Sequence, residues 1–285
     1  MPRILVTNHT RGSEAGVYLL ETETGGLRRL YDRRVNGITR GRDGIYFIEP
    51  DGIICHLDPA TWKVTQRCAT PYQACHDLRA VGDEFYLVAS TGNRVVRLDS
   101  SLNVLDELRV VQSDDDICHA NCIEAANGHL LLSIFTLSPG RRQEKNTTPV
   151  WFREGKVLRL DWETKSFEIV YEPLCQPHSL VWHGEQLYCC ESLTSEVSIL
   201  DLKSKTKKLL RRMHGFARGI AFHGDSVFIG ISQRKNNEGP LLDRLLARFR
   251  IPCGVVELDA RTWKPRRDFR IPGRQVYELL IVDEA

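Results

Sequence analysis

An apolar strand that ends in leucine followed by an acidic residue recurs six times along this chain, and the recurrence limits the possible folds more than any other feature. The six copies are Leu20-Glu21, Leu57-Asp58, Leu98-Asp99, Leu160-Asp161, Leu200-Asp201 and Leu258-Asp259. Most are followed by a polar turn and a second strand pattern, and residues 61–63 and 262–264 share the sequence Thr-Trp-Lys. Asp, Pro and Thr at such positions favour tight turns. The chain is therefore built from repeats.

The spacing of the repeats predicts a propeller or a solenoid. Successive leucines of the motif lie 37, 41, 62, 40 and 58 residues apart, which is a period of roughly 40 residues with about 20 extra in two intervals. Each unit contains four alternating apolar and polar segments separated by turn residues, most clearly in residues 76–110 and 178–212. Four short strands make one propeller blade. The alternative, a β-solenoid, lacks this four-strand pattern.

Six blades account for residues 1–285 as one domain. Five first strands begin at Asn36, His76, the segment from His119 to Asn121, His178 and Arg218. The sixth blade takes its first strand from residues 276–282 and its other three from residues 3–7, 16–21 and 27–31. We therefore predict an all-β fold, a six-bladed β-propeller closed by pairing of the N-terminal and C-terminal strands. Such closure leaves no open sheet edge.

Composition indicates a globular protein outside the membrane. Of the 285 residues, 42% are hydrophobic and 27% are charged, as in ordinary globular proteins, and no stretch approaches the 18 or so apolar residues that cross a bilayer. Residues 1–6 enter a strand without the basic and apolar regions of a secretory signal. We expect a cytoplasmic protein whose nine cysteines are reduced thiols.

The charge distribution argues against a nucleic-acid partner. A net charge of +2 gives no general attraction to a polyanion, although basic runs occur at residues 203–212, 234–250 and 261–274. Binding of single strands also needs exposed aromatic residues interleaved with the cations. The runs lack a convincing set, so we interpret them as solvated outer strands and loops.

Polar residues recur where the first strand of each blade begins. Alignment on the following hairpin places Asn36, His76, His178 and Arg218 at one equivalent position, and the third blade supplies either Asn121 or, with a two-residue bulge, His119. First strands line the centre of a propeller, so these side chains are expected to converge from separate blades. The alternative is that each one only satisfies backbone groups or holds water.

Convergent neutral imidazoles suit a divalent transition metal. We therefore predict His76, His119 and His178 as ligands of Zn, Fe, Cu or Mn. Arg218 would orient an anionic substrate through its planar fork of N–H donors, with Asn36 and Asn121 as further substrate contacts.

Two acids return to the same face of the ring. Glu49 and Glu191 each end a second strand, and a second strand runs back to the face where the first began. They are our candidates for a catalytic general base or a further metal ligand.

Cysteines accompany two of the histidines, as Cys75-His76 and Cys118-His119. Adjacent strand residues point to opposite sides, so these cysteines are expected to pack inside the blades as small apolar residues. The segment from Cys118 to Cys122 is the one place where a bulge would let a thiolate join the site.

The two long intervals predict insertions above the polar residues. The extra residues fall at 135–155 and 233–254, each between a second and a third strand, and long insertions tend to form lids or binding loops. The first adds cations and aromatic residues that suit an anionic or aromatic substrate. In residues 240–250 apolar residues recur at helical spacing. This pattern predicts an amphipathic helix that covers the site or docks a protein partner.

The motifs resemble those of known propellers. Residues 92–99 (Gly-Asn-Arg-Val-Val-Arg-Leu-Asp) and 155–161 (Gly-Lys-Val-Leu-Arg-Leu-Asp) resemble the six-bladed NHL and SMP-30-like propellers. A closer likeness is to an uncharacterised bacterial propeller family, through His-Asp-Leu at His76, Pro-His-Ser-Leu at Pro177 and Gly-Phe-Ala-Arg-Gly-Ile-Ala at Gly215. The resemblance implies the fold but no reaction. The calcium site typical of SMP-30-like lactonases, built from Glu, Asn and Asp, is not matched at the equivalent positions.

Two classes of function follow from these features. The first is a metal-dependent enzyme acting on an anionic small molecule, a sugar acid or a peptide. In its most concrete form it is a lyase, in which the metal and Arg218 neutralise a uronate carboxylate while Glu191 or another base removes the adjacent proton. The second is a non-catalytic propeller that serves as a platform for a protein or peptide, since propellers host both classes.

Overall fold

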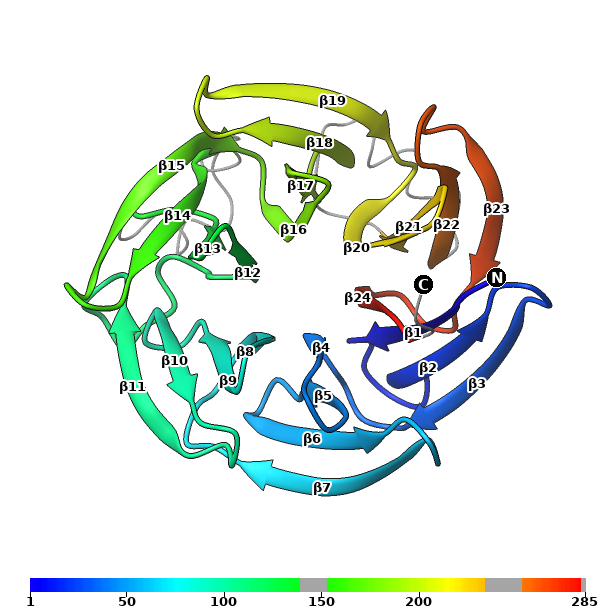
Figure 1. Cartoon of the computed structure of the whole chain (residues 1–285), viewed down its shortest axis with the longest axis horizontal. Coiled ribbons are helices and arrows are strands. Elements are labelled where there is room, and N and C mark those ends of the chain that lie inside the picture. Colours follow the sequence, from blue (N-terminus) through cyan, green and yellow to red (C-terminus); the bar gives the residue numbers. More distant parts are fainter. Residues whose placement is uncertain (139–152, 234–252, 283–285) are drawn as a thin grey trace.

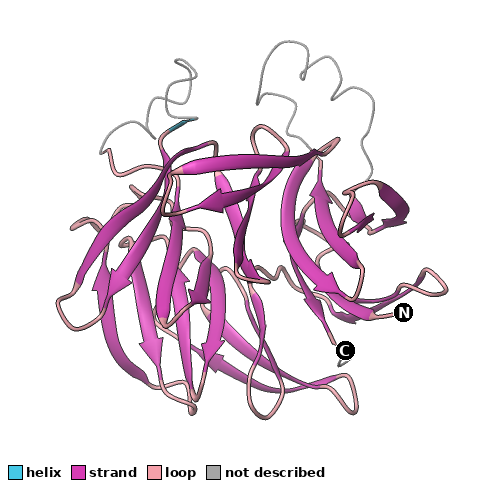
Figure 2. Cartoon of the chain, turned by 45° about the horizontal axis from the view of Figure 1, so that its top comes forward, coloured by secondary structure: helices cyan, strands magenta, loops and turns pink. Residues whose placement is uncertain are grey.

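Six four-stranded antiparallel sheets form a closed ring around a central axis (Figure 1). The computed structural model describes residues 1–138, 153–233 and 253–282. Strands make up nearly all of the regular structure in these residues (Figure 2). The predicted all-β, six-bladed propeller is confirmed.

Each blade is one sheet, and the first three blades follow one another in chain order. Blade 1 consists of β4 (Ile38–Arg40), β5 (Ile45–Ile48), β6 (Ile53–Asp58) and β7 (Lys63–Ala69). Blade 2 consists of β8 (Cys75–Val81), β9 (Glu84–Ala89), β10 (Arg94–Leu98) and β11 (Val104–Arg109). Blade 3 consists of β12 (Ile123–Ala126), β13 (His129–Ile134), β14 (Gly155–Asp161) and β15 (Ser166–Leu174).

The remaining blades complete the ring. Blade 4 consists of β16 (Pro177–His183), β17 (Gln186–Glu191), β18 (Glu196–Asp201) and β19 (Thr206–Arg212). Blade 5 consists of β20 (Phe216–His223), β21 (Ser226–Ser232), β22 (Gly254–Asp259) and β23 (Pro265–Arg270). Blade 6 consists of β24 (Val276–Ile281), β1 (Arg3–Asn8), β2 (Gly16–Glu21) and β3 (Gly26–Tyr31).

Blade 6 closes the ring with both ends of the chain, as predicted. Strand β24 pairs antiparallel with β1, with Ile4 opposite Ile281 and Val6 opposite Leu279. This pairing satisfies main-chain groups that a separate terminal strand would leave unpaired. The N-terminal and C-terminal segments therefore depend on each other for their structure.

The leucine and acid of the repeat motif have separate structural roles. All six leucines are buried, with exposed fractions of 5% or less. The following aspartates accept hydrogen bonds from backbone N–H groups in the turn between the third and fourth strands, as when Asp201 Oδ1 accepts from Lys203 N at 2.9 Å and Ser204 N at 3.0 Å. These bonds lower the pKa of Asp201. The motif thus marks the end of each third strand.

Apolar side chains pack between neighbouring blades. Six hydrophobic clusters lie at the six junctions, one to each pair of adjacent blades. First and second strands are mostly buried, whereas outer strands such as β19 are mostly exposed. This burial fixes the blades around the axis, because apolar burial is the main favourable term in folding.

Both predicted insertions lie between second and third strands, after β13 and after β21. Residues 139–152 and 234–252, which include the predicted helix at 240–250, lie outside the described residues. Within the described ranges, no helix is long and apolar enough to span a membrane. All nine cysteines are free thiols, as predicted.

Candidate functional site

One side chain from each blade occupies an equivalent position at the start of the first strand. Each lies two residues before a buried aliphatic residue, namely Ile38, Leu78, Ile123, Leu180, Ile220 or Leu279. We call these six side chains the axial ring: Asn36, His76, Asn121, His178, Arg218 and Tyr277. Figure 1 shows that their first strands, β4, β8, β12, β16, β20 and β24, are the innermost strands.

Tyr277 contacts four other members of the axial ring. The guanidinium carbon of Arg218 lies 5.4 Å from the centre of the Tyr277 ring, and the rings of His76 and His178 lie 6.0 and 6.4 Å from it. Its hydroxyl donates to Asn121 Oδ1 at 3.4 Å. Side chains from blades 2, 3, 4, 5 and 6 therefore meet at one phenol ring.

The sequence alone did not identify Tyr277 or His9 as part of this cluster. Tyr277 follows from applying the same register to the C-terminal strand. His9 has no equivalent position in the repeat, but its ring lies 5.9 Å from that of Tyr277, and its Nδ1 contacts Asn36 Oδ1. Only the folded ring brings His9 to the axis.

His119 precedes β12, and the register places Asn121, not His119, in the axial ring. With a backbone φ of 45°, His119 still reaches the cluster, and its ring packs edge-on against His76 at 4.6 Å. Phe135 packs against both His119 and His178, at 4.6 and 5.3 Å. Two of the three predicted metal ligands are thus in contact, and Phe135 lies between His119 and the third.

Hydrogen bonds fix the same tautomer in four histidines. His178 Nδ1 lies 3.0 Å from the carbonyl oxygen of Gln176, which only accepts, and His119 Nδ1 lies 3.0 Å from a carboxylate oxygen of Asp116. His9 Nδ1 contacts the amide oxygen of Asn36. In His76, Nδ1 contacts the Tyr277 oxygen, whose own proton is donated to Asn121.

In each of these four histidines Nδ1 therefore carries the proton, and the basic lone pair is on Nε2. A backbone carbonyl or carboxylate that fixes Nδ1–H is also the usual support of a metal-binding or catalytic imidazole.

The cluster combines neutral imidazoles with one permanent cation. Burial lowers the pKa of His76 and His178 well below the usual value, and the neighbouring Arg218 lowers both further. Burial lowers the pKa of His9 to about 4 and raises that of Tyr277. At neutral pH His9, His76, His178 and Tyr277 are uncharged, whereas the guanidinium of Arg218 keeps its charge. The arrangement suits an anion.

The predicted transition metal fits this geometry only in part. Imidazole Nε2 atoms with fixed tautomers are suitable ligands. Across residues 1–138, 153–233 and 253–282, however, no group of three or more His, Cys, Asp or Glu side chains is placed to hold a metal ion. Metal binding remains a prediction.

The two predicted acids bind cations of the outer strands. Glu191 is fully buried, pairs with Lys207 of β19 and accepts the backbone N–H of Cys175 at 2.6 Å. Glu49 accepts a hydrogen bond at 2.8 Å from Arg67 of β7. These contacts run outward within each blade. The structure therefore brings together the predicted Asn, His and Arg residues, with the two glutamates engaged elsewhere.

The cysteines near the site are packed as thiols. Cys75, in β8, and Cys118, in the segment before β12, are both fully buried, as predicted. Cys122 Sγ accepts the backbone N–H of Leu180 at 3.0 Å, and burial raises the pKa of Cys122 and brings that of Cys75 to about 12. Neutral thiols are poor metal ligands and poor nucleophiles.

Comparison with known proteins extends this description of the fold. The sequence profile of a family described as a domain of unknown function, DUF4915, matches residues 69–284. No curated protein matches the chain.

Several solved structures share the propeller at low sequence identity. A chain of a nidogen/laminin complex has a TM-score of 0.69 at 12% identity and covers 98% of this chain and 97% of its own. A protein of unknown function from Bacteroides caccae has a TM-score of 0.67 at 12% identity and covers all of both chains. A luciferin-regenerating enzyme has a TM-score of 0.60 at 13% identity, covering 86% of this chain and 78% of its own. At such identities the likeness concerns the fold alone.

Proposed function

The chain belongs to the DUF4915 family, a domain of unknown function, and we propose from the site alone that it is an enzyme whose axial ring binds and converts an anionic small molecule. The observation that carries this proposal is the placement of Arg218 among histidines held neutral and in one tautomer. A guanidinium binds carboxylate or phosphate with two parallel hydrogen bonds, and a neutral Nε2 is a base at physiological pH.

A sugar acid is the substrate class that uses all parts of this arrangement. Arg218 would hold the carboxylate and reduce the negative charge that develops when the adjacent carbon loses its proton. Nε2 of His76 or His178 would take that proton, since Glu191 is held by Lys207. The electron pair would then form a carbon–carbon double bond and expel the oxygen substituent of the next carbon, which takes up a proton as it leaves. The reaction class is a lyase.

Tyr277 supports His76 in this scheme. Proton transfer to Nε2 makes the imidazole cationic, and the Nδ1–H that faces the Tyr277 oxygen then donates more strongly. Asn121, which accepts the Tyr277 proton, keeps the phenol oxygen oriented toward His76. We therefore assign Tyr277 and Asn121 as positioning residues.

The transition metal is a separate part of the proposal. Nε2 of His76, His119 and His178 would bind it, and a bound metal would supply Lewis acidity to the site. None of the steps above requires it. Metal content is measured by elemental analysis of protein purified without a histidine tag. Stoichiometric Zn, Fe, Cu or Mn that is lost in His76→Ala and His178→Ala supports the metal, and metal-free protein argues against it.

Anion binding is tested with defined sugar acids. Calorimetric titration with galacturonate and glucuronate, and with the neutral sugars galactose and glucose, should show binding of the acids alone. Arg218→Gln should weaken that binding by about 10-fold or more, because a hydrogen bond to a charged group contributes about 1.5–3 kcal/mol. Arg42→Gln, at an exposed arginine paired with Asp83, is the matched control.

Turnover is tested with oligomers of galacturonate. Elimination creates an unsaturated product that absorbs in the ultraviolet, and His76→Ala or His178→Ala should abolish its appearance while leaving sugar-acid binding within a few fold. Wild-type protein that binds none of these acids and no metal would contradict the enzyme and favour the protein-binding platform.

A further inference from the structure

A cavity of about 390 Å³ lies beside the axial ring, at the junction of blades 6 and 1. Residues of three connections line it: those between β1 and β2, between β3 and β4, and between β5 and β6. Each of these connections leads from a second to a third strand, or from a fourth strand to the next first strand. All three therefore lie at the face of the ring where the first strands begin, which is the face of the axial ring.

His9 and Asn36 connect this cavity to the axial ring. His9 Nδ1 contacts Asn36 Oδ1, and a backbone hydrogen bond of 3.4 Å joins the two segments that contain these residues. Arg11, which lines the cavity, follows His9 by two residues, and Arg34, which also lines it, precedes Asn36 by two. The two segments run side by side and bring both arginines to the edge of the axial ring.

The electrostatic environment of His9 places these arginines close to its ring. Burial lowers the pKa of His9, and the contact with Asn36 opposes this shift. The guanidinium groups of Arg218, Arg34 and Arg11 then lower the pKa of His9 further. Arg218 belongs to the axial ring, and the other two line the cavity. The cavity thus adds two cations beside a ring that already contains one.

The total charge of the cavity does not determine which ligand it favours, since three arginines and three acids line it. Arg33 and Glu49 form an ion pair at 3.9 Å, and Glu49 also accepts a hydrogen bond from Arg67 at 2.8 Å. The positions of the other charges decide the preference, because the interaction between two charges weakens with their separation.

The other two acids lie away from the axial side of the cavity. Asp32 directly follows β3, the outermost strand of blade 6, whereas the half-buried Arg34 is at the inner end of the same connection (Figure 1). Asp51 lies toward blade 2, since its carbonyl oxygen accepts a hydrogen bond from Gln73 at 3.1 Å. Both aspartates are exposed, so solvent screens their charges. The cavity is therefore positive on the side that faces His9.

We propose that the substrate of the axial site carries two anionic groups, one held by Arg218 and the second held by Arg34 and Arg11. This inference rests on the function proposed above and narrows its substrate class to dianionic sugar acids. The second carboxylate belongs either to the other end of one sugar acid or to the next sugar in a chain of uronates. A guanidinium binds either carboxylate with two parallel hydrogen bonds.

Two pairs of probes test the second anionic group by calorimetric titration of the full chain. Galactarate and galactonate differ only in a carboxylate or a hydroxymethyl group at the far end of one carbon chain, and digalacturonate and galacturonate differ by a second uronate. In at least one pair the dianion should bind about 10-fold more tightly or better, and the preferred pair identifies the source of the second carboxylate.

The same titrations separate this inference from the function on which it rests. Acids that bind through Arg218, with no preference for the dianion in either pair, overturn the inference and leave the proposed function in place. If none of the four acids binds, both are overturned.

Variants test the location of the second group. The double variant Arg11→Gln, Arg34→Gln should remove most of the preference for the dianion. Arg33→Gln is the matched control in the same cavity, because Arg33 pairs with Glu49, and it should keep the preference.

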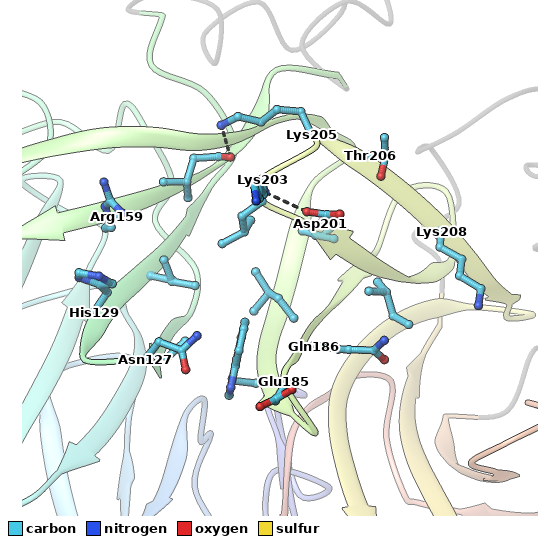
Figure 3. A pocket seen from close by; sticks show the side chains of 18 of the residues that line it. Asn127, His129, Arg159, Glu185, Gln186, Asp201, Lys203, Lys205, Thr206 and Lys208 are labelled. Atoms are coloured by element: carbon cyan, nitrogen blue, oxygen red, sulfur yellow. Dashed lines mark hydrogen bonds between the residues drawn. The ribbon is translucent and has the colours of Figure 1, made fainter.

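Lys203→Gln is the control at the opposite face of the ring. Lys203 lines a cavity of about 820 Å³ between blades 3 and 4, where its backbone N–H donates to Asp201 (Figure 3). This variant should also keep the preference for the dianion. A preference that survives in the double variant, or that is lost in either control, places the second group elsewhere and overturns the proposal.

Discussion

Two neighbouring rings of residues on the same six first strands have different roles. The axial ring is followed, one residue later, by a second ring made of Gly37, Asp77, Cys122, Ser179, Gly219 and Glu278. Both are buried and polar for the most part. In the second ring, however, Asp77, Cys122 and Ser179 accept backbone N–H groups of the next blade. The histidines that contact the axial ring instead have Nδ1 fixed and keep a basic Nε2.

The bonds of the second ring join successive blades. Asp77 Oδ2 accepts the N–H of Ile123 at 2.9 Å, and Cys122 Sγ accepts that of Leu180 at 3.0 Å. Ser179 Oγ accepts the N–H of Gly219 at 2.7 Å and donates to Glu278 at 3.2 Å. Gly37 has no side chain because a Cβ there would lie 2.3 Å from Asp77 Oδ1. Both rings are buried and polar, so these two properties do not distinguish the candidate site from a structural ring. The hydrogen-bond partners of each polar atom do distinguish them.

The largest expected effect on stability is that of Asp77→Ala in the second ring. Asp77 accepts the N–H groups of Ile123 and Leu78 and, together with Glu124, lowers the electrostatic cost of the half-buried Arg79. Loss of the carboxylate leaves these groups unsatisfied, so the free energy of unfolding should fall by about 3–5 kcal/mol. Urea denaturation measures it.

Arg218→Gln in the axial ring is the counterpart of Asp77→Ala. It should change the free energy of unfolding by less than about 1 kcal/mol while reducing sugar-acid binding. If both variants lose stability equally, the distinction between the rings fails.

Glu278 should make the protein less stable as pH rises. Burial and the nearby Asp77 raise its pKa from 4.5 to about 8, so the folded protein keeps the proton that the unfolded chain releases. The stabilisation is complete below pH 4.5 and is lost as pH rises toward 8. Between pH 5 and 7.5 the loss should be about 3 kcal/mol. Urea denaturation across this range should show the slope in the wild type and a flatter profile in Glu278→Gln.

His9, which contacts the axial ring, should have the opposite pH dependence. Its pKa is lowered to about 4 by burial and by Arg218, Arg34 and Arg11. The unfolded chain therefore takes up a proton that the folded protein excludes. The free energy of unfolding is therefore unaffected by His9 above pH 6.5 and falls as the pH drops toward 4. The loss should be about 2 kcal/mol between pH 7 and 5.

The measurement compares His9→Gln with the wild type and with His214→Gln, at an exposed histidine. His9→Gln should flatten the acid side of the stability profile. An unchanged profile would show that folding does not lower the pKa of His9.

A small loss of stability with no effect on binding is expected for Ser232→Ala, beside the axial ring. Ser232 Oγ donates to the carbonyl of Val276, directly before Tyr277, at 2.7 Å, and Ser192 Oγ donates in the same way to Ala217, before Arg218. Removing one such bond should cost about 1 kcal/mol and leave sugar-acid binding unchanged. A large loss of binding would mean that this bond also positions the ring.

The sequence predicted the fold well because the repeat is local. Each leucine and acid mark the end of a third strand, and turn residues follow at regular intervals, so the strands, the blades and the ring closure can be counted from the sequence. The same register places Asn36, His76, His178 and Arg218 at equivalent positions. Extended through the C-terminal strand, it also reaches Tyr277.

The partners of the candidate site were harder to predict. Glu49 and Glu191 were correctly placed at the ends of second strands, but their cations lie on fourth strands, about 16 to 18 residues further along the chain. The position of a residue in the repeat shows at which face of the propeller its side chain lies. It does not show which neighbour will neutralise its charge.

The sequence by itself determined the number of blades, their boundaries and the closure by both ends of the chain, because strand period and turn chemistry act over a few residues. The tertiary structure alone decided that His9 and Phe135 enter the cluster and that four imidazoles share one tautomer. These features depend on distances between side chains from different blades, which are set only when the ring closes.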